Sequence, residues 1–495
     1  MSGEWNDLVR ERIRKAGEIR RAGDNPYPND QKVGWTVARA RKAAEGKTGD
    51  DLAREPVRVD VAGRILAARH FGKAAFLVLT DRTGRLQVYL KKDRLGEESY
   101  ERFLKTVDVG DIAWAEGPLF VTRTGELTVE GARFRLLAKA LRPLPEKWHG
   151  LTDVETRYRQ RYVDLVVNEE VREIFRRRAR IVAFIRNFLA ERDFLEVETP
   201  MMHPVAGGAA ARPFVTHHNA LDMDLFLRIA PELYLKRLLV GGFERVFEIN
   251  RNFRNEGIST QHNPEFTMVE FYQAYATHED LMRLTEEMLS ELARELFGRT
   301  EFTVQGEEIS FAAPFERLTV AGTVARHAGV PEEKLSDPAV LGTLAREIGL
   351  AVKAGEAPGR VLVDIFEEVA ERKIKGPAFV TDYPVEVSPL SRRSDARPGI
   401  VDRFELIVLG REIANAFSEL NDPVDQRRRF EEQMRRRQAG DEEAHAMDED
   451  FLRALEYGMP PAAGEGIGVD RLVMLLTDSP SIRDVILFPH LRKEG

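Results

Sequence analysis

A series of short alternating segments between residues 57 and 137 constrains the fold more than any other feature of this sequence. Apolar and polar residues alternate in most of these segments, and turn sequences such as DRTG and TRTGE separate them. The segments are 57–61, 74–80, 86–90, 111–121 and 127–137. Alternation with a period of two is typical of half-buried strands, so five strands are predicted. Five short strands fit a small closed barrel of the OB type, and a generic five-stranded barrel fits the pattern equally well.

The length of 495 residues calls for two or three domains. The stretch LRPLPEKWHGL (Leu141–Leu151) contains two prolines and a glycine and has no periodicity, so we interpret it as an interdomain linker. An N-terminal domain is therefore expected at 1–145, with a helix before the barrel, and a second domain at 151–495. The basic residues of that helix form either a nucleic-acid-binding patch or a solvated face. They are Arg10, Arg12, Arg14, Lys15, Arg20 and Arg21.

Composition excludes several classes of protein. The chain has no cysteine, which rules out disulfides, thiolate metal sites and thiol nucleophiles. No apolar run is long enough to span a membrane, and the charged N-terminus MSGEWNDLVRERIRK lacks the apolar centre of a signal peptide. The net charge of −8 argues against wholesale coating of nucleic acid and leaves room for local basic faces. A cytoplasmic protein with no membrane partner is expected.

Two long helices are predicted in the second domain. One covers residues 171–191 and leads into the strand-like FLEVETP, and the other covers 279–297. Thr277 and Asp280 have the spacing of a capping box, and Gly298 stands where a C-cap is expected. Residues from about 278 to 360 are interpreted as a helical insertion with little chemistry.

Three well-known signatures are incomplete in this chain. GKT at Gly46–Thr48 would need a glycine in place of Arg41 to form a P-loop. GEGIG at Gly464–Gly468 would need one in place of Val469 to form a dinucleotide fingerprint. The ten histidines include no H-E-x-x-H pattern. Any nucleotide site must therefore use another architecture.

Residues 244–254 and 264–275 predict two strands joined by the polar loop EGISTQHN. Because side chains alternate along a strand, Phe266, Met268, Glu270 and Tyr272 share one face. An arginine, a loop histidine, an aromatic ring and a carboxylate on one surface offer phosphate pairing, base stacking and cation binding. A polar-faced hairpin of an ordinary antiparallel sheet fits the same pattern.

FRNEG (253–257) followed by HNPEFTMVEFY (262–272) resembles the second signature motif of the class II aminoacyl-tRNA synthetases, in its lysine-specific form. RFELIVLGREIANAFSELND, GEGIGVDRLVML and GGAAARPF are similar to other parts of the bacterial lysine-specific enzymes, and the resemblance covers nearly the whole chain. It implies an α+β protein in which an OB-type barrel precedes a catalytic domain built on an antiparallel sheet flanked by helices.

The resemblance also implies the roles of individual residues. Arg254 would contact the α-phosphate of ATP, and Phe266 would stack on adenine opposite Arg471, which also reaches the far phosphates. The implied ATP-binding residues are Arg254, Glu256, His262, Phe266, Glu405, Glu412 and Arg471, with Arg254 and Arg471 as the catalytic pair and Glu405 and Glu412 as magnesium ligands. The implied lysine pocket is formed by Gly208, Glu232, Glu270, Tyr272, Asn415, Phe417 and Glu419. Glu232 would take the α-amino group, and Glu419 with Tyr272 the ε-ammonium.

The magnesium ligands can be checked against strand geometry. A tight turn at Leu409–Gly410 would pair Ile407 with Glu412, which makes Glu405 and Glu412 diagonal neighbours on one face. Two carboxylates so placed suit a magnesium ion that keeps its waters and bridges phosphates, and a surface charge pair fits as well. Strict alternation places Glu412 opposite to Asn415, so both assignments hold only if a β-bulge lies between them.

Two further segments extend the resemblance. FLAERDFLEVETP (188–200) is similar to the first class II motif, which implies a homodimer, although Asp193 replaces a common glycine there. The barrel would read the anticodon of tRNA(Lys) through Phe76 and Gln87, with Arg69 and Glu116 as further contacts, and Phe76 as ordinary core is the alternative.

The expected function is ligation of lysine to the 3′-terminal adenosine of tRNA(Lys), with ATP as substrate and Mg²⁺ as cofactor. No general base is evident, so catalysis is expected from positioning and charge stabilisation. Ligation of asparagine or aspartate is an alternative, but aspartate would need a cation beside Glu419, and the segment SELN supplies none. Lysylation of a translation factor is another alternative, against which the N-terminal barrel argues. A non-catalytic tRNA-binding protein would not need Arg254, Glu405, Glu412 and Arg471, which are all present.

Overall fold

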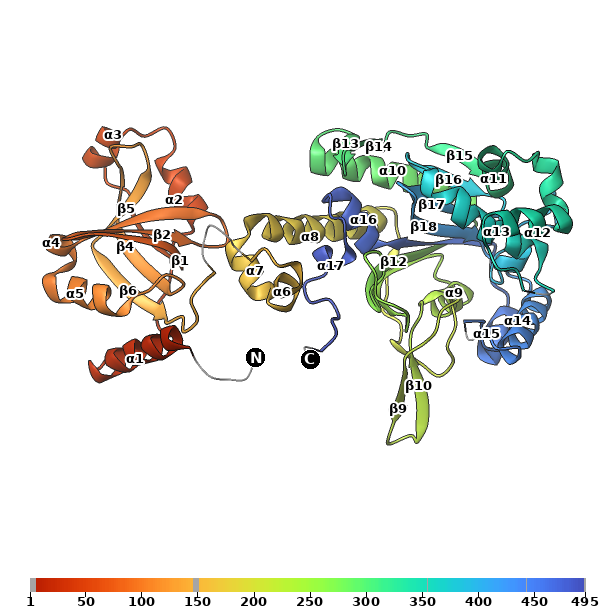
Figure 1. The fold of residues 1–495 in the computed structure, drawn as a ribbon, viewed down its shortest axis with the longest axis horizontal. Coiled ribbons are helices and arrows are strands. Elements are labelled where there is room, and N and C mark those ends of the chain that lie inside the picture. The colour runs from red at the N-terminus through yellow and green to blue at the C-terminus, as the bar shows by residue number, and fades with distance from the viewer. Residues whose placement is uncertain (1–5, 146–150, 354, 442, 494–495) are drawn as a thin grey trace. The chain divides into compact units, whose positions relative to one another are not determined.

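The computed structural model describes residues 6–145, 151–353, 355–441 and 443–493 (Figure 1). The chain divides into two compact units, Met1–Thr152 and Asp153–Gly495. Residues 146–150 of the predicted linker lie outside the described residues.

The first unit is a β-barrel. Its strands are β1 (Arg58–Phe71), β2 (Ala74–Thr80), β3 (Arg85–Lys91), β4 (Ile112–Val121), β5 (Leu127–Gly131) and β6 (Arg133–Ala138). They pair in the order β1-β2-β3-β5-β4-β6, and β4 also pairs with β1, so the sheet returns to its first strand. The predicted fifth strand is in fact two, because Ala132 separates β5, which pairs with β3 and β4, from β6, which pairs with β4 alone.

Alternate residues of these strands form the barrel core. Ala75, Leu77 and Leu79 of β2 are buried, and Phe76 points to the other face. The helices of the unit are α1 (Asp7–Arg21), α2 (Val37–Ala44), α3 (Gly49–Arg54), α4 (Lys92–Leu95) and α5 (Glu97–Thr106). In α1, Arg12 donates hydrogen bonds to the carbonyls of Val109 and Ala140 and holds the helix against the barrel.

The second unit is built on a sheet in the order β15-β16-β17-β18-β19-β12-β11-β7. Its strands are β7 (Leu195–Glu196), β11 (Arg245–Phe253), β12 (Glu265–Ala274), β15 (Glu316–Thr319), β16 (Ala378–Thr381), β17 (Arg403–Val408), β18 (Arg411–Ser418) and β19 (Ala462–Gly468). The neighbours from β16 to β11 are all antiparallel, and the two outermost pairs, β15 with β16 and β11 with β7, are parallel. GEGIG therefore lies in an antiparallel sheet, unlike a dinucleotide fingerprint.

Smaller elements complete this unit. A second sheet contains β8 (Met202–His203), β10 (Met223–Leu227) and β9 (Val215–His218), and a separate hairpin contains β13 (Glu301–Val304) and β14 (Glu307–Ser310). The helices are α6 (Val154–Arg159), α7 (Arg161–Val167), α8 (Glu169–Ala190), α9 (Glu232–Val240), α10 (His278–Phe297), α11 (Val320–Ala328), α12 (Pro338–Glu347), α13 (Pro358–Val369), α14 (Pro423–Gln438), α15 (Glu449–Glu456), α16 (Val469–Leu476) and α17 (Ile482–Val485), with short 3₁₀ turns at Glu332–Ser336, Glu371–Lys373 and Val385–Val387.

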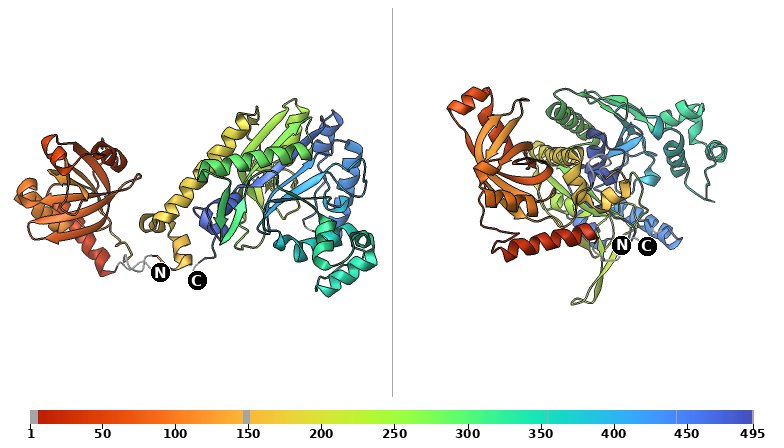
Figure 2. Two further views of the ribbon diagram at one scale, coloured as in Figure 1. Left: turned by 90° about the horizontal axis from the view of Figure 1, so that it is seen from above. Right: turned by 60° about the vertical axis from the view of Figure 1, so that its left-hand side comes forward.

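One face of the large sheet packs in the hydrophobic core, and the other face carries polar side chains. Val269 and Phe271 of β12 belong to the main hydrophobic core together with residues of α8, α10 and α16, which cover this face (Figure 2). Met268, Glu270 and Tyr272 point to the opposite face, where α9 packs. The predicted alternation along this strand is confirmed, and it leaves the polar face for the candidate site.

Local signals at the ends of the predicted helices are also confirmed. Thr277 and Asp280 form a capping box at the start of α10, and Gly298 adopts the left-handed conformation with φ of 72° at its end. Asp193 has φ of 65°, so the turn after α8 keeps the left-handed backbone that favours glycine even without one.

The region from about 278 to 360 is not purely helical, so that interpretation was wrong in part. It contains the hairpin β13–β14 and the strand β15, which extends the main sheet beside β16. α10 contributes to the main core, whereas α11, α12 and α13 enclose a separate hydrophobic cluster. Short strands at the sheet edge carry too few alternating residues to be distinguished from loops in the sequence.

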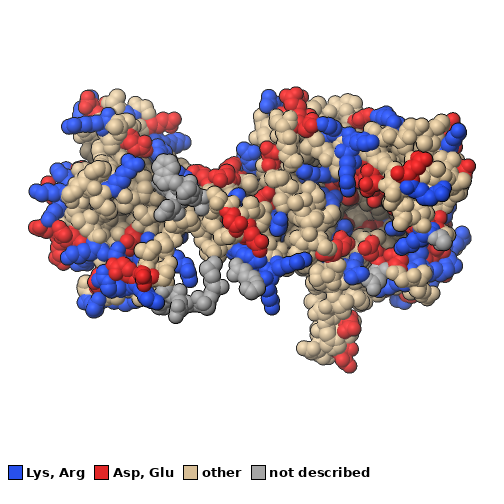
Figure 3. Space-filling model, viewed as in Figure 1, with Lys and Arg blue, Asp and Glu red and all other residues tan. Residues whose placement is uncertain are grey.

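Acidic and basic side chains are interspersed over both units on the face seen in Figure 3. Of the helices that the structure describes, none has both the length and the apolar composition needed to cross a membrane.

Candidate active site

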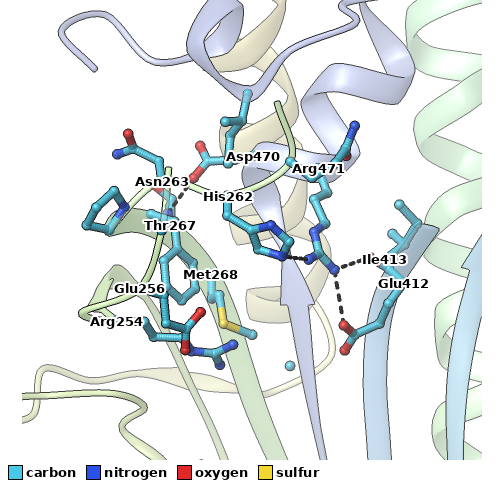
Figure 4. Close-up of a pocket in the computed structure, with 17 residues that line it drawn as sticks. Arg254, Glu256, His262, Asn263, Thr267, Met268, Glu412, Ile413, Asp470 and Arg471 are labelled. Atoms are coloured by element: carbon cyan, nitrogen blue, oxygen red, sulfur yellow. Dashed lines mark hydrogen bonds and ion pairs between the residues drawn. The ribbon is translucent and has the colours of Figure 1, made fainter. Parts of the chain in front are cut away.

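A pocket lies on the polar face of the large sheet, where β12, β18 and β19 run side by side (Figure 4). Residues that are far apart in sequence line it, among them Arg254, Glu256, His262, Phe266, Met268, Glu412 and Arg471. The structure thus brings together six of the seven residues predicted to bind ATP. Glu405, the seventh, stands on the neighbouring strand β17.

Arg254 follows the end of β11 and lies over the ring of Phe266, with 5.0 Å between its guanidinium carbon and the ring centroid. The backbone N–H of Arg254 donates to the carbonyl of Pro264, which fixes the residue at the end of the strand pair. Its Nε is buried and has no hydrogen-bond partner in the described part of the chain. A buried guanidinium with an open donor suits an anion, because guanidinium groups pair well with carboxylates and phosphates.

Arg471 is held from two sides at the start of α16. Its Nη1 donates to the carbonyl and to the carboxylate of Glu412, at 2.8 and 3.0 Å, and its Nη2 lies 3.2 Å from Nε2 of His262 (Figure 4). The preceding residue, Asp470, accepts from the backbone N–H of Thr267 at 2.7 Å and from Arg178 of α8. These contacts connect α16 to β12 and set the position from which Arg471 extends.

A β-bulge lies between Glu412 and Asn415, which is the condition under which both assignments made from the sequence can hold. Val408 pairs with Arg411 around the Leu409–Gly410 turn and Ile407 pairs with Glu412, whereas Leu406 pairs with Ala414, so Ile413 is the extra residue. Both turn residues have positive φ, 51° and 63°. The bulge reverses the alternation after Glu412, and this is what places Glu412 on the same face as Asn415.

Glu405 and Glu412 are therefore diagonal neighbours on the site face, as expected from the turn. Arg403 donates to Glu405 at 2.5 Å and to Oδ1 of Asn415 at 3.0 Å. Burial raises the pKa of Glu405, but for Glu412 the charges of Arg471 and Arg254 outweigh burial and hold the pKa below its usual value.

Within the described residues no group of three or more His, Cys, Asp or Glu side chains is placed to hold a metal ion. Two carboxylates alone fit a cation that takes its remaining ligands from water and a phosphate substrate.

A second group of predicted residues forms a buried acidic pocket beside this one. Glu232 of α9, Glu270 of β12 and Glu419 after β18 are all buried, and the hydroxyl of Tyr272 donates to Oε2 of Glu270 at 3.3 Å. Burial raises the pKa of Glu270 to about 8, and the nearby charge of Glu232 adds to the effect. Buried carboxylates of this kind are suited to bind a cation.

Two glycines let the side chains of this pocket pack closely against the backbone. A Cβ on Gly464 of β19 would lie 2.2 Å from Cε1 of Tyr272 and 2.4 Å from Oε1 of Glu419. Gly208 has φ of 92°, and a Cβ there would press against Ala230 and the Cβ of Glu232 at 3.2 and 3.4 Å. No larger residue can take either position without moving the carboxylates or the tyrosine.

One cation in the pocket was not predicted. Lys236 of α9 is completely buried, its Nζ lies 2.7 Å from Oε1 of Glu232, and it forms an ion pair with Glu419. The expectation that no cation stands beside Glu419 is therefore wrong, because α9 supplies what the segment SELN lacks. The spacing Glu232-x-x-x-Lys236 was the available signal, but in a sequence it is read as an ordinary helical salt bridge.

On the barrel, three predicted residues lie near one another on the outer face of neighbouring strands. Phe76 pairs across the strands with Arg69 on one side and with Tyr89 on the other, and its ring stacks on Tyr89 with 4.7 Å between centroids. Gln87 of β3 accepts a hydrogen bond from Thr128. Tyr89 was not predicted as part of this surface, because the alternation along a strand does not show which of its two faces is exposed. Phe76 does not belong to the barrel core.

The structure does not group Glu116 with these residues. Glu116 of β4 stands across from Asp60, near the opposite end of β1 from Arg69. Its carboxylate forms ion pairs with Arg133 and Arg58. The anticodon contact of Glu116 therefore stays a prediction, for a part of the barrel surface that strand pairing separates from Arg69 and Phe76.

Comparisons with known proteins agree with this architecture. Residues 153–492 match the family of class II tRNA synthetases (D, K and N), and residues 59–137 match the OB-fold nucleic acid binding domain. The chain belongs to the class II tRNA synthetases.

Relatives identify the branch of the class. The lysine–tRNA ligase of Magnetococcus marinus is 55% identical over 494 residues, which cover 99% of this chain and 98% of the relative. Those of Thioalkalivibrio sulfidiphilus and Carboxydothermus hydrogenoformans are 56% and 55% identical, with 99% of this chain and 98% and 99% of the relatives covered. Within its class, the chain belongs to the lysine–tRNA ligase family.

Proposed function

We propose that this chain activates lysine with ATP and transfers it to tRNA(Lys). In the first step, a carboxylate oxygen of lysine attacks the α-phosphorus of ATP, which forms lysyl-adenylate and releases pyrophosphate. In the second step, the 3′-hydroxyl of the terminal adenosine of tRNA attacks the acyl carbon and AMP leaves. One observation carries the proposal: β12 presents Phe266 to the arginine-lined pocket and Glu270 and Tyr272 to the adjacent acidic pocket on the same face.

Arg254 and Arg471 are the catalytic residues of the proposal. Arg254 binds the α-phosphate, where negative charge increases during the attack, and Arg471 binds the distal phosphates. Phe266 stacks on adenine, and Glu256 and His262 hold the nucleotide. A preformed guanidinium stabilises developing charge without reorganisation, so positioning and electrostatics supply the catalysis and no general base is needed.

Glu405 and Glu412 are the proposed ligands of Mg²⁺. Their placement on one face, with few other carboxylates to complete a cage, fits an ion that shares its remaining positions with water and phosphate oxygens. Bound there, the ion would neutralise phosphate charge. The bulge at Ile413 supports the assignment, because it lets Glu412 and Asn415 serve adjacent ligands from one strand.

The acidic pocket is the proposed lysine site. Glu232 takes the α-amino group and Glu419 takes the ε-ammonium. Gly208, Glu270, Tyr272, Asn415 and Phe417 form the rest of the pocket. A cation of an amino acid is favoured in a site with three buried carboxylates, and an acidic side chain would be repelled. Lys236 does not reverse this preference, because two of those carboxylates already neutralise it.

The barrel is the proposed anticodon-binding domain (1–145), and the catalytic domain is 151–495. Arg69, Phe76 and Gln87 form the reading surface, since exposed aromatic rings stack on unpaired bases and side-chain amides read base edges. Because lysine–tRNA ligation serves translation, we place the protein in the cytoplasm.

The catalytic domain is also proposed to form a homodimer. β7 is the last strand of the large sheet, and Leu195, Met201 and Met202 nearby are about half exposed. Exposed apolar side chains beside an unpaired sheet edge are a suitable dimer surface.

The test is charging of a tRNA pool with labelled lysine in the presence of ATP and Mg²⁺. We expect lysyl-tRNA to form only when all components are present, and periodate-oxidised tRNA, which lacks the terminal hydroxyl, to accept none. Absence of charging by a folded protein would overturn the proposal.

A further inference from the structure

Lys236 occupies an unusual position for an internal lysine. It is completely buried, and its ammonium contacts two carboxylates from different elements, Glu232 of α9 and Glu419 after β18. The same ammonium lies 5.2 Å from the ring centroid of Phe417. Burial lowers the pKa of a lysine, but the charges of Glu232 and Glu419 outweigh burial and raise the pKa of Lys236 above its usual value. The two carboxylates therefore favour the charged form of Lys236 inside the acidic pocket.

Its two partners are the carboxylates to which the proposed function assigns the two ammonium groups of the substrate. Because the ammonium of Lys236 contacts both carboxylates, it limits the distance between the carboxylate of Glu232 and that of Glu419. Oε2 of Glu419 forms the ion pair with Lys236, whereas Oε1, which lies against Gly464, has no hydrogen-bond partner among the described residues. Glu419 thus offers one oxygen to the protein and one to a second cation.

We propose that Lys236 is a positioning residue that holds Glu232 and Glu419 at the separation required by the two ammonium groups of lysine. This inference rests on the proposed lysine site. It adds an explanation of how that site would distinguish lysine from amino acids with a shorter side chain. An amino acid with one methylene fewer, such as ornithine, cannot reach both carboxylates while Lys236 keeps them in place. Without Lys236, the two carboxylates repel each other and lose the fixed separation.

A buried lysine between two carboxylates can also serve folding alone, and this chain contains such a case. Lys139 in the first unit is completely buried and forms ion pairs with Asp108 and Asp111 of the barrel. Neither partner belongs to a proposed substrate site. Lys139 is therefore the matched control for the loss of a buried bridging cation.

The experiment compares Lys236→Met and Lys139→Met with the wild type in amino-acid-dependent ATP–pyrophosphate exchange, with lysine and ornithine as substrates. For Lys236→Met we expect the KM for lysine to rise about tenfold or more, and the preference for lysine over ornithine to fall by a similar factor, as for one methylene in a fitted pocket. The KM for ATP should change less than about twofold, since the ATP residues do not contact Lys236. Lys139→Met should leave all three quantities unchanged.

An unchanged lysine-to-ornithine ratio in Lys236→Met overturns the inference, whether the KM for lysine is normal or rises equally for both amino acids. If Lys236→Met does not fold, as judged by circular dichroism, Lys236→Gln takes its place, because its amide still donates to the buried carboxylates but carries no charge. Failure of the proposed function is recognised separately, since the wild type would then show no lysine-dependent exchange.

Discussion

Nη1 of Arg471 donates to both the backbone carbonyl and the carboxylate of Glu412, at 2.8 and 3.0 Å. The arginine proposed to bind the far phosphates is therefore held by a carboxylate proposed to bind Mg²⁺. Because the Glu412 carboxylate would serve both Mg²⁺ and Arg471, neutralising its charge would free the guanidinium of Arg471 for the phosphates.

Glu412→Gln should lower the rate of lysine-dependent exchange and raise the Mg²⁺ concentration needed for half-maximal rate. The amide oxygen can still accept from Arg471, but it no longer neutralises a divalent cation, and we expect a loss of about 10²-fold in rate. The measurement is exchange as a function of Mg²⁺ concentration. The control is Glu308→Gln, which changes an exposed carboxylate of β14. Normal rate and metal dependence in Glu412→Gln would remove Glu412 from the metal site.

Lysine binding should release protons near neutral pH. Burial raises the pKa of Glu270 to about 8, so at pH 7 this carboxyl is largely protonated in the free protein. An ammonium bound nearby favours the carboxylate, so lysine binding expels protons and becomes stronger as the pH rises from 6 to 8. Calorimetry in phosphate and Tris buffers at pH 7 measures the release, and Glu270→Gln should reduce it. Identical binding enthalpies in the two buffers would contradict the prediction.

Glu465 should make the catalytic domain less stable at higher pH. It lies on the core face of β19, where burial raises its pKa to about 8, offset only in part by hydrogen bonds from the hydroxyl of Thr285 at 2.7 Å. A carboxyl whose folded pKa is raised stabilises the fold fully below its ordinary pKa and loses that contribution as the pH rises to about 8.

Glu465→Gln removes this titration, so we expect it to raise the free energy of unfolding at pH 8 by on the order of 2 kcal/mol and to change it less at pH 5. Urea denaturation of both proteins at the two pH values measures the difference. An identical pH dependence of unfolding in wild type and variant would show that Glu465 does not titrate in this range.

Phe76→Ala should weaken tRNA binding without affecting lysine activation. Loss of one base-stacking contact of about 1–3 kcal/mol raises the KM for tRNA about tenfold. Exchange without tRNA should be normal, because it needs only the second unit. Glu98→Ala, an exposed residue of α5, serves as the control. A normal KM for tRNA in Phe76→Ala would place the reading surface elsewhere on the barrel.

Local periodicity was enough to predict much of the fold. Alternation identified the barrel strands and both faces of β12, and the Thr277–Asp280 spacing located the start of α10, because these signals depend on neighbours in sequence. The bulge at Ile413 was only a condition at the level of the sequence, since Glu412 and Asn415 can share a face only if one residue is inserted, and the pairing of β18 with β17 was needed to establish it.

Contacts between distant segments were not predictable. Lys236 of α9 contacts Glu419 after β18, and Thr285 of α10 contacts Glu465 of β19, so neither pair leaves a pattern in either segment. The separation of Glu116 from Arg69 was not predictable for a related reason: the register between β1 and β4, not the order of the strands, determines which residues share a surface. The strand β15 was missed because its partner β16 lies about sixty residues away.

Lysine-dependent ATP–pyrophosphate exchange, measured side by side with aspartate and asparagine, tests the central claim most directly. The account predicts exchange with lysine alone, and near-complete loss in Arg254→Ala with circular dichroism unchanged, because Arg254 is the guanidinium proposed to meet the α-phosphate. Exchange with aspartate or asparagine as fast as with lysine, or a normal rate in Arg254→Ala, would contradict it.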